Sequence, residues 1–346
     1  MRNLRSYVSS RADIASHWLE IPRPQHSNGL VSRTIADNWT LRASASTLSA
    51  AHGLHKRGYR IKAAFFNHLT ALSFFPLARR IPCILSIDTT PVLLNRDREW
   101  YRPHGFHTTG VAEHLSKHWT RWTYSGVRYL LPWSKLAADS LMNDYKIRSN
   151  RIVIQPPGID LSFWKPIQNG NEQRERFSVL FVGGDFLRKG GDTLLRVALD
   201  DNFRDVDFHF VTKSFSGPTP HNVHVHDDVL PNSDCLVNLY QNSDVFVLPT
   251  HADYAPTNAV VEAFATGLPV ISTEVGGLGE LLAEDNQGFV IGIGDSDNLG
   301  KRLVQLKEDK ALLSQMKCNA RKYAEKNFDI RANGSKIIDM LAEISS

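Results

Sequence analysis

The sequence predicts an α/β protein with parallel sheets, divided into two domains. Its 346 residues exceed what one hydrophobic core usually serves. Short apolar runs rich in β-branched residues alternate with helical segments, and short loops join them. The charge is also divided: residues 1–165 carry 23 Lys+Arg and 10 Asp+Glu (+13), and residues 166–346 carry 17 and 26 (−9). A single domain leaves this separation unexplained, so we expect two.

The second half shows the alternation most clearly. An apolar run at 177–182 ends at Gly183 and Gly184, and periodic Leu and Val residues follow, which predicts a strand, a glycine turn and a helix. The rest of this half predicts strands at 206–211, 223–225, 244–248 and 270–272, helices at 193–199, 236–240 and 258–266, and two amphipathic helices within 301–346. Ligands on parallel sheets bind at the carboxyl ends of the strands, where we expect a site.

The first half predicts fewer elements. They are helices at 48–57 and 134–144 and strands at 63–66, 83–87 and from 130 onward. Ser134 is a natural N-cap for the second helix. Asn3-Leu4-Arg5 resembles the start of a helix, whereas a domain of this kind opens with a strand and a glycine loop. We therefore expect a chain truncated at its N-terminus, without that strand, and weak activity of the chain as given.

Composition excludes several classes of protein. No apolar run approaches the ~20 residues of a membrane-spanning helix, and the first residues lack the apolar core of a secretion signal. Cys83, Cys235 and Cys318 lie far apart, which argues against a disulfide scaffold or a zinc site and suits the reducing cytoplasm. The basic first half should attract an anionic partner. No recognised nucleic-acid module accompanies the charge, so we expect no nucleic acid.

The strongest motif runs from Gly183 through Arg188 and Lys189 to Gly191, between a predicted strand and a predicted helix. Glycines let the backbone approach a phosphate, the helix N-terminus offers N–H donors, and the two cations supply charge. A plain glycine turn with solvated basic residues is the alternative. The motif matches neither a Walker loop nor a GxGxxG fingerprint, which disfavours mononucleotide hydrolysis and nicotinamide chemistry.

A second motif lies at 249–271, where a polar loop leads into a helix that carries Glu262. A carboxylate in the first turns of a helix can accept hydrogen bonds from both hydroxyls of a ribose, and the N-terminal amides can bind a sugar or a phosphate. The alternative is a surface glutamate stabilised by the helix dipole.

Together with Gln155-Pro-Pro-Gly-Ile-Asp160 and Ser134-Lys-Leu-Ala-Ala-Asp-Ser, these motifs resemble glycosyltransferase family 4 in order and spacing. The resemblance covers residues 130–330 well and the earlier residues loosely. It implies a GT-B fold, in which two Rossmann-like domains face each other across a cleft, with a nucleotide-sugar donor on the second domain. It also implies retention of anomeric configuration, no catalytic metal and no cofactor.

The resemblance also implies roles for the residues of both motifs. Gly183 and Gly184 belong to the donor-binding turn, and Arg188 and Lys189 match the cations that bind the diphosphate. Glu262 matches the second of two family glutamates eight positions apart, the one that contacts the ribose.

The first family glutamate should fall at position 254, but this chain has Tyr254 there, with Asp253 beside it. Either Asp253 serves through a one-residue shift of the loop, or the usual contact to the donor sugar is absent. We favour Asp253. Thr257 and Asn258 would lie at the start of the helix, near the donor.

Two polar residues of the first half, His68 and Asp88, follow predicted strands and are candidate catalytic groups on the acceptor side of the cleft. The alternatives are a histidine that binds loop backbone and an aspartate that caps a turn. The same half interleaves aromatic and cationic residues, which indicates either ordinary packing or binding to acidic lipid. They are Trp100, Tyr101, Arg102, Trp119, Arg121, Trp122, Arg128 and Tyr129.

The sequence therefore predicts a retaining glycosyltransferase in the cytoplasm, peripheral on the inner face of the membrane. It would transfer a hexose from a nucleotide-diphosphate sugar to a lipid-linked or glycan acceptor. We expect an acceptor domain at 1–160, a donor domain at 161–328, and a helix at 329–346 that packs back on the first domain. Two rival functions stay open: a sugar-nucleotide epimerase on the same architecture, and a non-catalytic partner subunit, which the missing strand and Tyr254 suggest.

Overall fold

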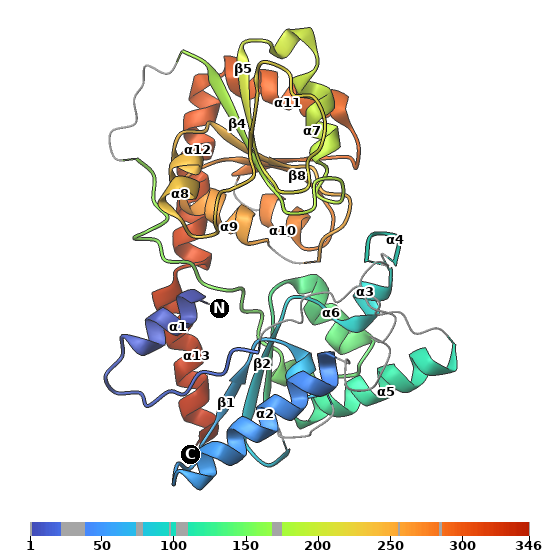
Figure 1. Cartoon of the computed structure of the whole chain (residues 1–346), viewed down its shortest axis with the longest axis vertical. Coiled ribbons are helices and arrows are strands. Elements are labelled where there is room, and N and C mark those ends of the chain that lie inside the picture. The colour runs from blue at the N-terminus through green and yellow to red at the C-terminus, as the bar shows by residue number, and fades with distance from the viewer. Residues whose placement is uncertain are drawn as a thin grey trace. The chain divides into compact units, whose positions relative to one another are not determined.

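The computed structural model describes residues 2–21, 39–73, 79–96, 98–101, 110–167, 175–254, 257–283 and 286–345 (Figure 1). The chain divides into two compact units. The N-terminal unit comprises Met1–Pro157 and Arg331–Ser346, and the C-terminal unit comprises Gly158–Ile330. This division falls close to the expected boundaries at residues 160 and 328, and the last helix belongs to the N-terminal unit.

The C-terminal unit is built around a six-stranded parallel sheet in the order β6-β5-β4-β7-β8-β9 (Figure 1). Strands β7 and β8 are buried along their whole length, as expected for central strands that are covered on both faces. The strands are β4 (Phe177–Val182), β5 (Val206–Val211), β6 (Val223–His226), β7 (Val245–Leu248), β8 (Val270–Thr273) and β9 (Gly288–Ile291). The α/β fold class with a parallel sheet is confirmed.

Helices follow most of these strands. They are α7 (Gly191–Ala198), α8 (Asp234–Gln241), α9 (Asn258–Ala265), α10 (Leu278–Ala283), α11 (Ser296–Glu308) and α12 (Lys310–Asn327), with a short 3₁₀ helix η6 (Asp201–Phe203). Fully buried aromatic rings fill the core, and Trp164 packs edge-on against Tyr240 at 5.4 Å between ring centroids. This packing fixes the ring of Tyr240 on α8, whose hydroxyl takes part in the site described below.

The N-terminal unit contains, within the described residues, a three-stranded parallel sheet in the order β1-β2-β3. The strands are β1 (Ala64–Phe66), β2 (Cys83–Ile87) and β3 (Tyr129–Pro132). The helices are α1 (Arg2–Ser9), α2 (Trp39–Lys56), α3 (Pro91–Arg96), α4 (Arg98–Tyr101), α5 (Val111–Gly126), α6 (Lys135–Asn143) and α13 (Ile330–Ser345), with 3₁₀ turns η2 (Leu69–Ala71) and η5 (Ser149–Arg151).

Two local predictions for the N-terminal unit are confirmed. Residues 2–9 form a helix, α1, as the first residues indicated. Ser134 is the N-cap of α6, and its hydroxyl accepts a hydrogen bond from the Ala137 N–H at 3.2 Å. The last helix, α13, contacts this unit through Glu343, which accepts a hydrogen bond from the Tyr129 hydroxyl at 2.7 Å.

Other predictions are wrong. Residues 301–346 contain three helical segments rather than two, because Asp309 ends α11 and caps α12. The Asp309 carboxylate accepts from the Leu312 N–H at 2.8 Å, and no Gly or Pro signals the break. Helix α2 begins at Trp39, nine residues before the predicted start at Leu48, because its first turns are too polar to show apolar periodicity. Strand β9 was not predicted.

Candidate functional site

The glycine turn between β4 and α7 is held against the end of β7. Gly190 has a left-handed backbone (φ +75°), and a Cβ there would overlap the carbonyl oxygen of Pro249. A Cβ on Gly191 would overlap the ring of Phe186, which itself packs in the core against Phe181 at 5.8 Å. Glycine is therefore required at both positions, and the turn joins the two strand ends closely.

Arg188 ties this turn to the residues after β7. Its Nη1 donates to the carbonyl oxygen of Ala252 at 2.9 Å, and its Nε pairs with the Asp185 carboxylate at 3.1 Å. Its own carbonyl oxygen accepts from the His251 N–H at 2.9 Å. The guanidinium thus lies at the carboxyl ends of β4 and β7, where a parallel sheet binds its ligands.

Lys189 forms an ion pair with Asp253, 64 residues away in the sequence. The two side chains are only 13% and 14% exposed. Burial lowers the pKa of Lys189, and the negative charge of Asp253 opposes this change. Of the two candidates for the first family glutamate, Asp253 is the one beside the cation of the glycine turn, while Tyr254 is buried.

Helix α9 carries the remaining predicted donor residues. Thr257 is its N-cap and accepts from the Val260 N–H at 3.4 Å, and Asn258 is its exposed first residue. The Glu262 carboxyl accepts from the buried Tyr240 hydroxyl at 3.1 Å. Burial raises the pKa of Glu262 to about 8, so this carboxyl is largely protonated near neutral pH.

His68 and Asp88 belong to the other unit. The Nδ1 atom of His68 accepts from the Thr70 N–H at 3.3 Å and caps η2, as in the alternative interpretation of a loop histidine. Asp88 directly follows β2, and its carboxylate accepts from the neighbouring Thr89 N–H at 2.8 Å. Arg188, Lys189 and Asp253, by contrast, all belong to the C-terminal unit, where the contacts described above bring them together.

Sequence reasoning missed three contributors to the site. Asp185 is the partner of Arg188, and Tyr240 is the partner of Glu262. Gly276 has a left-handed backbone (φ +64°) and lies so close to the Asp253 carbonyl oxygen that a Cβ would overlap it. Asp185 lies three residues before Arg188 within the glycine motif, and a Gly-Gly pair at Gly276 follows the predicted strand at 270–272, whereas nothing in the sequence marked Tyr240.

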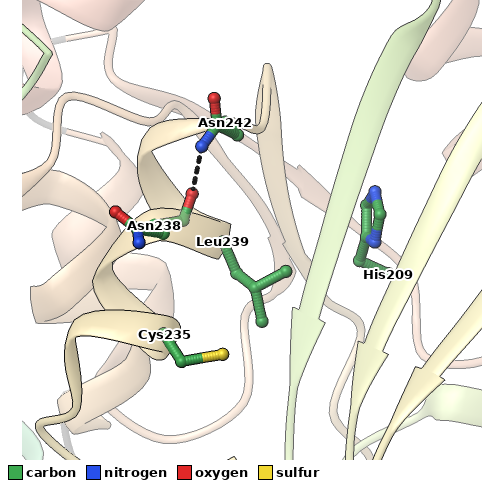
Figure 2. Close-up of a pocket in the computed structure, with 5 residues that line it drawn as sticks. All are labelled: His209, Cys235, Asn238, Leu239 and Asn242. Carbon is green, nitrogen blue, oxygen red and sulfur yellow. Dashed lines mark hydrogen bonds between the residues drawn. The ribbon is translucent and has the colours of Figure 1, made fainter.

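A second polar cluster occupies the face of β5 and β6 beside α8. Figure 2 shows His209 of β5 across a hollow from Leu239 of α8, with Cys235 and Asn238 on the same helix and Asn242 directly after it. The His209 ring stacks on His224, and its Nδ1 lies 3.1 Å from Nε2 of His226. Burial, together with the two neighbouring imidazoles, lowers the pKa of His209 to about 4. Among the described residues, no group of three or more His, Cys, Asp or Glu side chains could hold a metal ion.

The fold and the arrangement of its loops define the class of protein. The chain has two units with parallel sheets, and one unit carries a glycine turn with Arg188 and Lys189 beside the end of β7. This is a GT-B fold, as the resemblance implied. Residues 219–323 match the model of the family "Glycosyl transferases group 1". The chain therefore has a GT-B fold and, within its C-terminal unit, a segment similar to this family.

Individual relatives agree with this class. The chain is 27% identical over 212 residues to a D-inositol 3-phosphate glycosyltransferase of Rhodococcus jostii, covering 54% of this chain and 46% of that protein. It is 35% identical over 109 residues to the UDP-Gal:alpha-D-GlcNAc-diphosphoundecaprenol alpha-1,3-galactosyltransferase of Escherichia coli, covering 32% and 28%. The match thus spans less than half the length of either relative.

A solved structure shows the same fold. Anabaena HepE in complex with UDP superposes with a TM-score of 0.66 at 16% identity, covering 86% of this chain and 82% of that one.

Proposed function

We propose that the protein is a retaining glycosyltransferase of family 4, which transfers a sugar from a nucleotide-diphosphate sugar to an acceptor hydroxyl. One observation carries the proposal. Arg188 and Lys189 lie at the carboxyl ends of β4 and β7, on a turn where the open space beside Gly184 allows a phosphate to approach the backbone. The UDP and UDP-glucose complexes of the structurally similar HepE support a nucleotide sugar as the ligand.

The same residues suggest how transfer would proceed. The bond between the anomeric carbon and the diphosphate breaks, and the diphosphate leaves with the electron pair. Arg188 and Lys189 stabilise the negative charge that develops there, so the proposal includes no catalytic metal. The acceptor oxygen bonds to the anomeric carbon on the face that the diphosphate leaves, and its proton passes to the departing phosphate. Asp253 lies beside Lys189 and is our candidate for the contact to the donor sugar.

A thermal-shift panel tests the donor site. We expect one of UDP, GDP or ADP to raise the melting temperature of the full chain, because a ligand that binds only the folded state adds ~2.7 kcal/mol at 100 times its Kd. The matching monophosphate should shift it less, since it lacks the second phosphate. If no diphosphate shifts the melting temperature, the donor-site assignment is wrong. Incubation with donor alone separates the rivals, because an epimerase converts the donor without an acceptor.

We further propose that the N-terminal unit docks on an anionic membrane, on the cytoplasmic face, where a lipid-linked acceptor would be presented. One face of α5 exposes a row of apolar residues at spacings of four, four and three, which is one side of a helix. They are Val111 (78% exposed), Leu115 (67%), Trp119 (44%) and Trp122 (37%). Lys117 and Arg121 lie on the same helix, and the Arg79 guanidinium lies over the Trp122 ring at 4.6 Å.

This surface combines what an interfacial helix needs: an apolar face, Trp residues and neighbouring cations. Of the other aromatic and cationic residues noted in the sequence, Tyr129 lies at the start of β3, and Arg102 lies outside the described residues. No helix among the described residues is long and apolar enough to cross a membrane.

Flotation with vesicles tests the docking. We expect the full chain to float with vesicles that contain acidic lipid and to be released as salt rises, because screening limits the attraction to ~8 Å at physiological salt. Leu115→Asp should abolish flotation, whereas Leu230→Asp, at a similarly exposed leucine of the C-terminal unit (63%), should not. Binding that salt leaves unchanged, or that Leu115→Asp leaves intact, would contradict the proposal.

A further inference from the structure

Both cations of the proposed phosphate site are already neutralised by carboxylates of the same chain. Lys189 pairs with Asp253, and Arg188 pairs with Asp185. The two carboxylates differ in burial, since the side chain of Asp185 is 48% exposed and that of Asp253 only 14%. Water therefore screens the charge of Asp185 much more than that of Asp253. A diphosphate that binds Lys189 competes with Asp253 for its ammonium group.

The position of Asp253 does not depend on Lys189 alone. The preceding carbonyl, that of Ala252, accepts hydrogen bonds from Arg188 at 2.9 Å and from the Thr250 hydroxyl at 3.1 Å. The Asp253 carbonyl itself is approached by Gly276, at a distance that no side chain at 276 would allow. The backbone on both sides thus holds Asp253 in place, so its carboxylate stays near the phosphate site after the ion pair opens.

A carboxylate held in this position also affects the binding of a diphosphate at Lys189. In this structure Asp253 is the counter-ion that opposes the effect of burial on the pKa of Lys189. Once a diphosphate takes over Lys189, Asp253 becomes a negative charge beside a negatively charged ligand. Like charges at short distance in a buried site repel strongly. The size of this repulsion depends on how much charge the ligand carries.

We propose that Asp253 makes the donor site discriminate between the nucleotide sugar and the spent nucleoside diphosphate. The terminal phosphate of the diphosphate has a second ionisation near pH ~6, which the sugar ester lacks, so the spent nucleotide carries about one more negative charge. Asp253 repels it more than the intact donor, and this favours release of the product. The inference rests on the proposed function of the site.

Calorimetry on the full chain tests it with UDP and UDP-glucose, or with the corresponding GDP or ADP pair if the thermal-shift panel selects that base. We expect Asp253→Asn to tighten UDP binding by about tenfold, the scale of one interaction with a charged group. UDP-glucose binding should tighten clearly less. Asp205→Asn is the matched control, because Asp205 also pairs with a lysine, Lys307 at 2.6 Å, but on the surface of the same unit. It should leave both affinities unchanged.

Two outcomes would overturn the inference: UDP binding that Asp253→Asn does not tighten, or equal tightening of UDP and UDP-glucose. Asp253→Glu keeps the negative charge and should keep the discrimination, so its loss in this variant would also count against a charge effect. A wild-type chain that binds none of these nucleotides would instead contradict the proposed function on which the inference rests.

Discussion

Arg188→Ala is expected to weaken nucleoside-diphosphate binding by about 1.5–3 kcal/mol, the scale of a hydrogen bond to a charged group. The guanidinium supplies charge at the ends of β4 and β7 and also holds the carbonyl oxygen of Ala252 at 2.9 Å. Arg188→Lys keeps the charge but loses the planar fork of donors, so it should recover only part of the affinity. Calorimetry with the diphosphate identified by thermal shift measures both variants.

Lys189→Ala should cost a similar amount of affinity and destabilise the fold as well. It leaves Asp253, only 14% exposed, without its counter-ion, and breaking such a pair costs about 3–5 kcal/mol. The double variant Lys189→Ala/Asp253→Ala should recover stability but not binding, which separates the two effects. Arg204→Ala is the control, since Arg204 pairs with Asp201 on the exposed surface of the same unit. If Arg188→Ala and Lys189→Ala both leave the affinity for the diphosphate unchanged, these residues do not form a phosphate site.

The parts of this site that the sequence predicts are those encoded locally. An apolar run of β-forming residues, followed by Gly-Gly and by periodic Leu and Val, is enough to predict β4, the glycine turn and α7. Arg188 and Lys189 lie within that turn, so their place at a strand end follows from sequence order alone. Thr257 as the N-cap of α9 is likewise a local feature, since its hydroxyl bonds three residues ahead.

What the sequence could not predict depends on contacts between distant segments. The pairing of Lys189 with Asp253 requires β4 and β7 to be neighbours, and no local pattern in this chain specifies strand order. The neutral state of Glu262 depends on burial beside Tyr240, 22 residues earlier in the sequence. For His68, a position after a strand is compatible with catalysis and with capping, and only the folded structure shows the hydrogen bond from the Thr70 N–H.

Glu262→Gln is expected to make the fold more stable in alkaline solution. Burial raises the folded-state pKa of Glu262 to about 8 from 4.5, so the folded protein binds more protons than the unfolded chain between these values. The free energy of unfolding of the wild type therefore falls as pH rises from 4.5 to about 8. The glutamine side chain is neutral at every pH, so the variant should lack this decline and exceed the wild type in stability above about pH 8. Denaturant titrations across this range measure the difference.

The same substitution should weaken nucleotide binding, most strongly where stability gains most. An ionised Glu262 can accept hydrogen bonds from both ribose hydroxyls, but below about pH 8 binding first has to remove its proton. Measured with the nucleotide sugar, which lacks the second phosphate ionisation, wild-type affinity should therefore rise with pH up to about 8, whereas that of Glu262→Gln should stay flat and lie about 1.5–3 kcal/mol lower above that pH. Glu325→Gln, at an exposed glutamate paired with Arg321, controls for the substitution itself. If the affinities of the wild type and Glu262→Gln change with pH in the same way, Glu262 does not contact the ribose. A gain in stability without a loss of binding would show that Glu262 is only a structural residue of α9.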